Sequence, residues 1–396
     1  MAPDLPTLSL LPGQHKRLAQ GYPWVYSNEV AMNAEARALP PGSLVRLLTA
    51  KGESLGLALF NRNALVAARL IARSPKQRID AAFFAKILQR ALTLRDGLYR
   101  EPFYRLIHAE ADGLPALIVD RYGESLVVQL NAAGMETLKA PLLEALEGLL
   151  KPRCILLNDE AGLRQAEGLP AGERLIKGQP DDPLPLRENG LACLARISGG
   201  QKTGWFYDQR DNRAWIARFA AGRRVLDAYC YAGGFALNAA QDGASEVLGL
   251  DRSESALALA REAAALNGLE TRCRFEKEEV FAGLGRLARE GQLFDLMIVD
   301  PPAFVKGRKE LAQGLKGYRK LARLAAQVTA PQGLLFMASC SQPVEARRFT
   351  EAVALGLQDA GRQSRILRLS GAAADHPTHP LLPESAYLKA LTLALD

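Results

Sequence analysis

The chain has 396 residues, enough for two or three domains, because a single hydrophobic core rarely grows beyond about 250–300 residues. Hydrophobic residues make up 48% and aromatic residues 7% of the sequence, which is ordinary for a soluble folded protein. No apolar run reaches the ~20 residues that a membrane-spanning helix needs, and the start has no signal-peptide pattern. We therefore expect a cytoplasmic protein with no membrane partner.

The net charge of +7 is concentrated near the N-terminus. Residues 1–79 contain ten Lys or Arg against four Asp or Glu, a net of +6. A basic small domain on a near-neutral body favours a polyanionic partner such as nucleic acid. A solvated basic surface without a partner is the alternative.

The five cysteines form no CxxC pair and no even framework. A disulfide scaffold or a structural zinc site is therefore disfavoured, and we expect no metal. Any functional cysteine would act alone, in a reducing compartment.

The first 75 residues resemble a small β domain. Residues 42–61 and 64–73 alternate short apolar runs with turn residues, which is typical of strands in a barrel or sandwich. The polar segment 73–80 is a linker. We predict a small β domain over 1–75 that binds nucleic acid.

Residues 76–190 predict a middle α+β domain. The elements expected there are helices over 81–99 and 135–150, a hairpin over 113–131 with Asp120 to Gly123 in its turn, and a strand over 154–159.

From about Leu191 to the C-terminus, strands and helices alternate. The expected strands end in "RRVLDAYCY", "EVLGLD", "RCRFEKEEV", "FDLMIVD" and "GLLFMASC". Such alternation predicts an α/β domain over 191–396 with a doubly wound, largely parallel sheet. Ligands bind beyond the carboxyl ends of such strands, where the candidate motifs lie.

The end of the first of these strands favours S-adenosylmethionine (SAM) over a nicotinamide cofactor. Gly233 and Gly234 allow a tight turn and close backbone approach, yet they do not form the GxGxxG pattern of a pyrophosphate site. Asp251, 18 residues after Gly233, is placed to accept from ribose hydroxyls. Glu278 and Glu279 end the third strand, where an acid can accept from an adenine amine. Helix capping competes for each acid, above all for Asp251, which precedes Arg252 and Ser253.

Asp300-Pro301-Pro302 follows a buried apolar strand. The prolines fix φ and remove two N–H donors, so the loop is rigid and its carbonyls and Asp300 can face a ligand. Phe304 is placed to stack on a planar base. Ala303 between the prolines and Phe304 departs from the NPPY motif of amino-group methylases.

Cys340 ends the next strand, so it is expected beside Asp300. Cytosine C5 is not nucleophilic enough to take a methyl group unaided, whereas addition of a thiolate to C6 makes C5 enamine-like. A free thiol has a pKa near ~8.5, so the site must lower it or accept the proton during attack. Arg347 and Arg348 are candidates to assist. Cys193, Cys230 and Cys273 lie in apolar segments and are interpreted as core.

At this point the chain resembles the RlmI-type large-subunit ribosomal RNA cytosine-C5 methyltransferases over essentially its whole length. The matching stretches are "GYPWVYSNEV" (21–30), "ADGLPALIVDRYG" (111–123), "KTGWFYDQRDNR" (202–213), "YAGGF" (231–235), "DPPAF" (300–304), "SCS" (339–341) and "DHPTHPLLPESAYLK" (375–389).

The resemblance implies an N-terminal PUA domain, a middle α+β domain and a C-terminal Rossmann-like methyltransferase domain acting on 23S rRNA. It implies that Cys340 is the nucleophile, with Asp300 as the second catalytic candidate. The implied cofactor-binding residues are Phe206, Gln209, Arg210, Asp227, Tyr231, Gly233, Gly234, Phe235, Asp251, Arg252, Glu278, Glu279, Asp300 and Pro301. The candidate substrate-binding residues are Pro302, Phe304, Lys16 and Arg17. Asp375 and His376 match a family motif but receive no role.

Two alternatives stay open. The first is SAM-dependent methylation of an exocyclic amine without a covalent adduct, and the second is an RNA-binding protein with a vestigial methylase fold. An Asp pair is more usual in the family where this chain has Glu278 and Glu279. The sequence leaves the modified nucleotide, the base that removes the C5 proton and the oligomeric state undecided, with a homodimer among the options.

Overall fold

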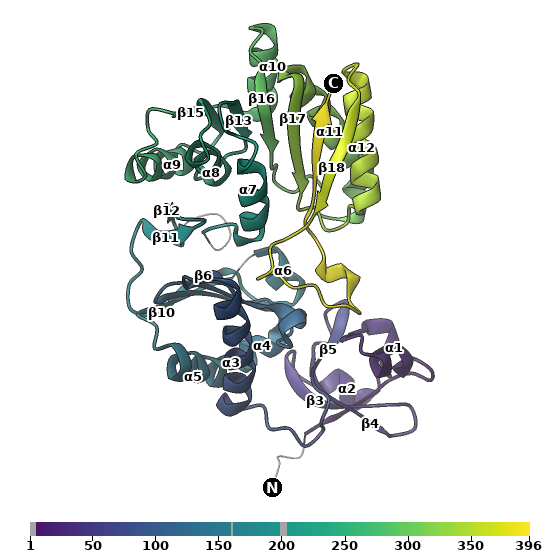
Figure 1. Cartoon of the computed structure of the whole chain (residues 1–396). Helices are drawn as coiled ribbons and strands as arrows, with labels where there is room; N and C mark the ends of the chain where they lie inside the picture. Colours follow the sequence, from purple (N-terminus) through teal and green to yellow (C-terminus); the bar gives the residue numbers. More distant parts are fainter. Residues whose placement is uncertain (1–4, 160, 199–203) are drawn as a thin grey trace. The chain divides into compact units, whose positions relative to one another are not determined.

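A computed structural model of the chain describes residues 5–159, 161–198 and 204–396. The chain divides into two compact units (Figure 1). Unit 1 comprises Met1–Asp182, Arg196–Trp205 and Asp375–Ser385, and unit 2 comprises Pro183–Ala195, Phe206–Ala374 and Ala386–Asp396. The domain boundaries expected at residues 75 and 190 stay predictions.

Unit 1 contains two five-stranded sheets. The first has the order β1-β3-β4-β5-β2 and the second β10-β9-β8-β7-β6. The strands of the first are β1 (Thr7–Ser9), β2 (Trp24–Tyr26), β3 (Ser43–Leu48), β4 (Ser54–Phe60) and β5 (Val66–Ala72), with helices α1 (His15–Gln20) and α2 (Ala34–Ala38). The strands of the second are β6 (Phe103–His108), β7 (Leu117–Tyr122), β8 (Ser125–Leu130), β9 (Cys154–Asp159) and β10 (Gly172–Lys177), with helices α3 (Ala81–Leu98), α4 (Ala133–Thr137), α5 (Lys139–Leu150) and α6 (Ala161–Ala166).

Helices α3 and α5 cover the second sheet because their apolar residues recur at helical spacing. Phe84, Leu88 and Ala91 of α3 are buried with Leu142 and Leu146 of α5 against the strands. Leu57 and Leu59 of β4 belong to the same core cluster. The small β sheet and the α+β part of unit 1 therefore share apolar packing.

The expected hairpin over 113–131 is present, but its predicted turn is wrong. Asp120, Arg121 and Tyr122 lie within β7, and the turn contains only Gly123 and Glu124. Asp120 is fully buried and accepts two hydrogen bonds from Arg105 of β6, at 2.8 and 2.9 Å. This buried ion pair holds a polar residue inside the strand, where its turn propensity alone would not place it.

Unit 2 contains a short hairpin of β11 (Leu184–Glu188) and β12 (Leu191–Ala195) and a seven-stranded sheet of order β15-β14-β13-β16-β17-β19-β18. Its strands are β13 (Arg224–Ala228), β14 (Glu246–Asp251), β15 (Cys273–Lys277), β16 (Phe294–Val299), β17 (Thr329–Ser339), β18 (Ser364–Ser370) and β19 (Lys389–Leu395). The first five pair in parallel and β19 pairs antiparallel with both β17 and β18. The predicted doubly wound α/β fold is confirmed.

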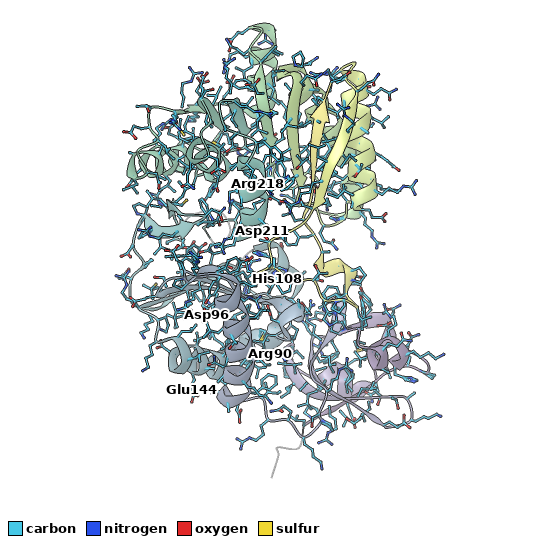
Figure 2. All side chains as sticks on the ribbon, in the orientation of Figure 1. Arg90, Asp96, His108, Glu144, Asp211 and Arg218 are labelled. Carbon is cyan, nitrogen blue, oxygen red and sulfur yellow. The ribbon has the colours of Figure 1, made fainter. Side chains whose placement is uncertain are left out.

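Six helices flank this sheet (Figure 1): α7 (Arg210–Ala217), α8 (Gly234–Gln241), α9 (Glu254–Leu266), α10 (Val280–Arg289), α11 (Leu311–Val328) and α12 (Ala346–Asp359). Helices α7, α8 and α9 contact one another in series, and so do α10, α11 and α12. Figure 2 labels Asp211 in α7 and Arg218, the residue that follows its last turn. Among the described helices, none is long and apolar enough to cross a membrane.

A buried polar network organises part of unit 1. Arg95 of α3 is 0% exposed and forms two hydrogen bonds with Asp112, at 2.6 and 2.7 Å, and one with the carbonyl of Asp375, at 3.1 Å. The Asp112 carboxylate also accepts from the N–H of His108, which Figure 2 labels. The 375–385 segment is thereby held within unit 1 by a fully desolvated guanidinium.

We predict that Arg95→Met destabilises the protein by about 3–5 kcal/mol, because it leaves the Asp112 carboxylate buried without its cation. Urea unfolding of the full-length variant measures the loss. Lys177→Ala is the matched control in the same unit, since Lys177 pairs with Glu147 at 2.7 Å on the surface, where ion pairs contribute about 0–1 kcal/mol. Equal losses in the two variants would contradict the prediction.

Candidate functional site

Asp227 marks the end of β13 with a buried carboxylate. The residue is 0% exposed, and its Oδ2 accepts from the N–H of Ala236 at 2.9 Å. Its Oδ1 has no hydrogen-bond partner among the described residues. Burial raises the pKa of Asp227 well above its usual value, and the charges of Asp300 and Asp251 act in the same direction. A buried acceptor without a donor is a candidate contact for a ligand that donates hydrogen bonds.

The loop from β13 to α8 has a strained backbone. Tyr229, Tyr231 and Gly233 have φ angles of 66°, 49° and 81° in the left-handed region. A Cβ on Gly233 would lie 3.0 Å from the Cβ of Ala260. Gly234 begins α8 and is buried. Left-handed conformation at non-glycine residues is costly and is concentrated at ligand sites.

Asp251 ties this loop to β14. Its carboxylate accepts from the N–H of Tyr231 at 3.0 Å and from the N–H of Ser253 at 2.8 Å. The cap of α9 is Ser253, whose hydroxyl accepts from Ala256 at 3.3 Å, whereas Arg252 is exposed. Helix capping was the alternative role for Asp251, and Ser253 performs it instead. The ribose contact stays a prediction.

Glu278 and Glu279 follow β15 directly, and both have intramolecular partners. Glu278 pairs with Arg286 of α10 at 2.7 Å. Glu279 caps α10 by accepting from the N–H of Ala282 at 3.1 Å. The expectation that they end the strand is wrong by one or two residues, because the cap of α10 begins there. Their contact with adenine stays a prediction.

The segment that leads into α7 is held by a buried carboxylate. Arg210 and Arg213 contact Glu188 at 3.3 and 2.6 Å, and Glu188 is the last residue of β11. The Phe206 ring lies 5.3 Å from the Tyr231 ring at 80°. Residues 202 and 203 of the expected closing segment lie outside the described residues.

Two further predicted cofactor residues pack internally. Gln209 accepts from Asn212 at 2.7 Å, and the Phe235 ring lies 5.2 Å from the Phe336 ring of β17. Both side chains are buried. Both side chains pack within unit 2, and their contacts with a cofactor stay predictions.

The Asp-Pro-Pro loop and the Cys340 turn lie together, as the parallel pairing of β16 and β17 predicts. The Cys340 Sγ lies 3.9 Å from the carbonyl oxygen of Pro301. The Asp300 N–H donates to the carbonyl of Ala228 at the end of β13, at 3.4 Å. Three strand ends therefore meet at one place.

The serines on either side of Cys340 hold its turn in position. Both are fully buried. The Ser339 hydroxyl donates to the Tyr318 hydroxyl at 2.8 Å, which lies 2.8 Å from the hydroxyl of Ser341. The Ser341 hydroxyl also accepts from the N–H of Val305 at 3.1 Å, which links the turn to the Asp-Pro-Pro loop. The network fixes the backbone of Cys340 through α11.

Phe304 packs on the same helix. Its ring lies 4.8 Å from the Tyr318 ring at 30°, and a Cβ on Gly317 would lie 3.0 Å from it. Phe304 is half-buried and Pro302 is exposed. Stacking of Phe304 on a substrate base stays a prediction.

Lys389 is a residue that the sequence reasoning did not single out. It begins β19 opposite Ser339, and its Nζ donates to the carbonyls of Ser341 at 2.5 Å and Tyr387 at 2.8 Å. Burial lowers the pKa of Lys389 to about 8. Lys389 is the last residue of the "DHPTHPLLPESAYLK" stretch, but nothing in the sequence of that stretch predicts its contact with Ser341.

The four cysteines other than Cys340 are unsuited to act as nucleophiles. Burial raises the pKa values of Cys193 and Cys273 to about 12, and those of Cys154 and Cys230 are also raised. All four are therefore poor thiolates. Burial confirms the interpretation of Cys193 and Cys230 as core, whereas Cys273, expected there too, is only half-buried at the start of β15. Cys273 and Cys340 are half-buried.

A basic stripe lies on α11, which supports the Cys340 turn, and on the short 3-10 helix η4 (Arg308–Glu310) just before it. It consists of Lys309, Lys316, Lys320 and Arg323, and all four are exposed. Spacings of four and three residues place Lys316, Lys320 and Arg323 on one face of α11. No carboxylate of the described chain forms a salt bridge with these four side chains. The nearby acids are engaged elsewhere, Glu310 with the N–H of Lys306 and Asp359 with Arg319.

Lys16 and Arg17, the predicted RNA contacts, lie in α1 of unit 1. Lys16 is exposed. The Arg17 guanidinium pairs with Glu29 at 2.6 Å and lies 4.5 Å from the Tyr22 ring centroid. Contact with RNA stays a prediction for both.

Asp375 and His376 belong to the buried network of unit 1. The His376 Nδ1 lies 2.7 Å from Asp375 Oδ1, and its ring lies 5.0 Å from that of His108. The other oxygen of Asp375 accepts from the N–H of Arg105 at 2.9 Å. Both residues thus anchor their segment within unit 1.

We predict that Gly233→Ala weakens SAM binding and destabilises the protein, because the added Cβ meets Ala260 and the backbone remains left-handed. Gly268→Ala is the matched control, since Gly268 has a φ of 66° and open space around it. The left-handed conformation alone costs about 1–2 kcal/mol. Calorimetry with SAM and thermal unfolding measure both effects. The same loss of binding in both variants would exclude a specific role for the crowded loop.

Two family models match the chain. One, described as S-adenosylmethionine-dependent methyltransferase, covers residues 168–394, and the other, described as PUA-like domain, covers residues 8–73. The chain is similar over 98% of its length to a solved methyltransferase complexed with SAH, with a TM-score of 0.84 and 21% identity, covering 100% of that chain. At this identity the likeness shows the fold.

Curated relatives are similar to nearly the whole chain. Ribosomal RNA large subunit methyltransferase I of Erwinia tasmaniensis is 37% identical over 387 residues, covering 96% of this chain and 97% of the relative. The protein of the same name from Aeromonas hydrophila is 36% identical over 393 residues, covering 98% of both. The chain therefore belongs to the family of S-adenosylmethionine-dependent methyltransferases that contains the ribosomal RNA large subunit methyltransferase I proteins.

Proposed function

We propose that the chain methylates C5 of a cytosine in 23S ribosomal RNA through a covalent bond between Cys340 and C6. The observation that carries the proposal is the position of Cys340, a half-buried thiol 3.9 Å from the Pro301 carbonyl at the end of the sheet that carries the β13 loop. The relatives named as ribosomal RNA large subunit methyltransferases support the substrate.

The residues at the end of β13 fit the cofactor. The unpartnered Oδ1 of Asp227 suits an ammonium donor such as the amino-acid tail of SAM, and Gly233 leaves room for close backbone approach. Asp251, Phe206 and Tyr231 would complete the pocket. When bound, SAM supplies an electrophilic methyl group on a sulfonium.

Cys340 supplies what the cytosine lacks. Its thiolate forms a bond to C6, and the electron pair of the C5–C6 bond becomes available at C5, which then accepts the methyl group. Loss of the C5 proton to a base re-forms the double bond and breaks the Sγ–C6 bond. The rigid Asp-Pro-Pro loop beside Cys340 would hold the ring in place, with Asp300 and Phe304 as its contacts.

An RNA base must leave its stack to be reached in this way, so unpaired RNA is the expected substrate. The basic stripe on α11 is positioned for the flanking phosphates, because the segment between Phe304 and Lys309 connects it directly to the Asp-Pro-Pro loop. Lys16 and Arg17 provide a second candidate contact in unit 1.

We predict that Cys340→Ser binds SAM and RNA with wild-type affinity and transfers no methyl group, because a serine hydroxyl is a far weaker nucleophile at C6. Mass spectrometry of methylcytosine in the RNA measures the loss. Cys273→Ser is the matched control, since Cys273 is equally half-buried and should keep full turnover. Full turnover by Cys340→Ser would favour methylation of an exocyclic amine instead.

We predict that the double variant Lys316→Gln, Lys320→Gln raises KM for RNA and reduces the slope of log affinity against log salt by about 1.4, since each lost phosphate contact on single-stranded RNA lowers it by about 0.7. The exposed pair Arg218→Gln, Arg365→Gln removes the same charge elsewhere in unit 2 and should leave the slope unchanged. Equal slopes for the two doubles would exclude the stripe as a phosphate contact.

A further inference from the structure

The turn that carries Cys340 is bonded to a lysine. The Nζ of Lys389 donates to the carbonyl of Ser341, the residue after Cys340, at 2.5 Å, and to the carbonyl of Tyr387 at 2.8 Å. The antiparallel pairing of β19 with β17 places Lys389 opposite Ser339, the residue before Cys340. The backbone of Lys389 is therefore paired with the residue before Cys340, and its ammonium binds the residue after it.

Lys389 is half-buried, yet no carboxylate among the described residues forms a salt bridge with it. A buried lysine without an acid is costly, and burial lowers the pKa of Lys389 to about 8, while the charge of Cys340 acts in the opposite direction. The negative charge of the Cys340 thiolate therefore stabilises the protonated form of Lys389.

Among the described groups that hydrogen-bond to the turn, three more are neutral hydroxyls. Ser339, Ser341 and Tyr318 contribute hydroxyls, and the charge of Cys340 raises the pKa of Tyr318, which burial raises more strongly. Asp300 follows β16 beside the turn, and Asp208 accepts from the hydroxyl of Tyr387 at 2.5 Å. A carboxylate near the turn opposes a thiolate, whereas a cation favours it.

We propose that Lys389 is the positioning residue of Cys340, whose ammonium holds the turn through the Ser341 carbonyl and favours the thiolate that attacks the base. The inference rests on the proposed nucleophilic role of Cys340. A cation beside a thiol stabilises the thiolate relative to the thiol, which activates the cysteine. The thiol proton leaves to solvent water before attack, and Lys389 keeps its own protons.

The test is the pH dependence of alkylation of Cys340 by iodoacetamide in the full-length protein, followed by peptide mass spectrometry without RNA. Lys389→Met should move the midpoint upward by about one pH unit, so that alkylation near neutral pH falls about tenfold. Lys389→Arg keeps the charge and should stay near the wild-type midpoint. Lys277→Met, at the exposed end of β15, is the control and should change nothing.

An unchanged midpoint in Lys389→Met would overturn the proposal, and so would an equal shift in the Met and Arg variants, which would indicate packing alone. SAM calorimetry checks that each variant is folded, and Lys389→Gln replaces the Met variant if that one is not. A methylcytosine assay of Cys340→Ser runs in parallel. Turnover by that variant would contradict the covalent mechanism while leaving the midpoint shift intact, so the two failures are distinguishable.

Discussion

The parallel pairing of β13 with β14 on one side and β16 on the other is the constraint on which the candidate site depends. The strand order reverses between β13 and β16, which makes this position the topological switch point of the sheet. The loops after the two strands run in opposite directions there and leave space for a ligand. Asp227 lies near the end of β13, and Asp300 follows β16. Pairing of β17 with β16 then adds Cys340 to the same edge.

Buried polar groups determine how accurately this edge is built. Two serines and Tyr318 satisfy one another around Cys340, and their hydroxyls link β17, α11 and the loop after β16. A fully paired network of this kind is rigid, because breaking any bond leaves a buried group without a partner. The serines of "SCS" therefore position the cysteine, and their own hydroxyls are not free to attack a substrate.

Buried polar groups are also paired in unit 1, where charged groups form the network in place of hydroxyls. Arg95 is fully buried and is matched by Asp112 and by the carbonyl of Asp375. Asp375 in turn accepts from Arg105 and contacts His376. Asp375 and His376 of the "DHP" stretch thus form contacts that hold segment 375–385 within unit 1. A few residues later the chain begins β19, which contributes Lys389 to unit 2.

The doubly wound sheet and the location of the motifs at its strand ends were predictable from the sequence. Apolar runs that alternate with helical periodicity specify a doubly wound sheet, and the carboxyl ends of its strands meet at one edge whatever the loops do. The position of Cys340 beside the Asp-Pro-Pro loop follows from that rule alone. Turn propensity was a poorer guide, since Asp120 lies in a strand because Arg105 is its partner.

The partners of the polar side chains were decided only by the tertiary structure. Glu279 caps a helix, Asp251 binds the N–H of Tyr231, and Lys389 binds Ser341, 48 positions earlier in the sequence. Local patterns encode which residues are buried and with what period, because burial repeats along each element. They do not encode hydrogen bonds between elements distant in sequence, since these form only when packing brings a donor within about 3 Å of an acceptor.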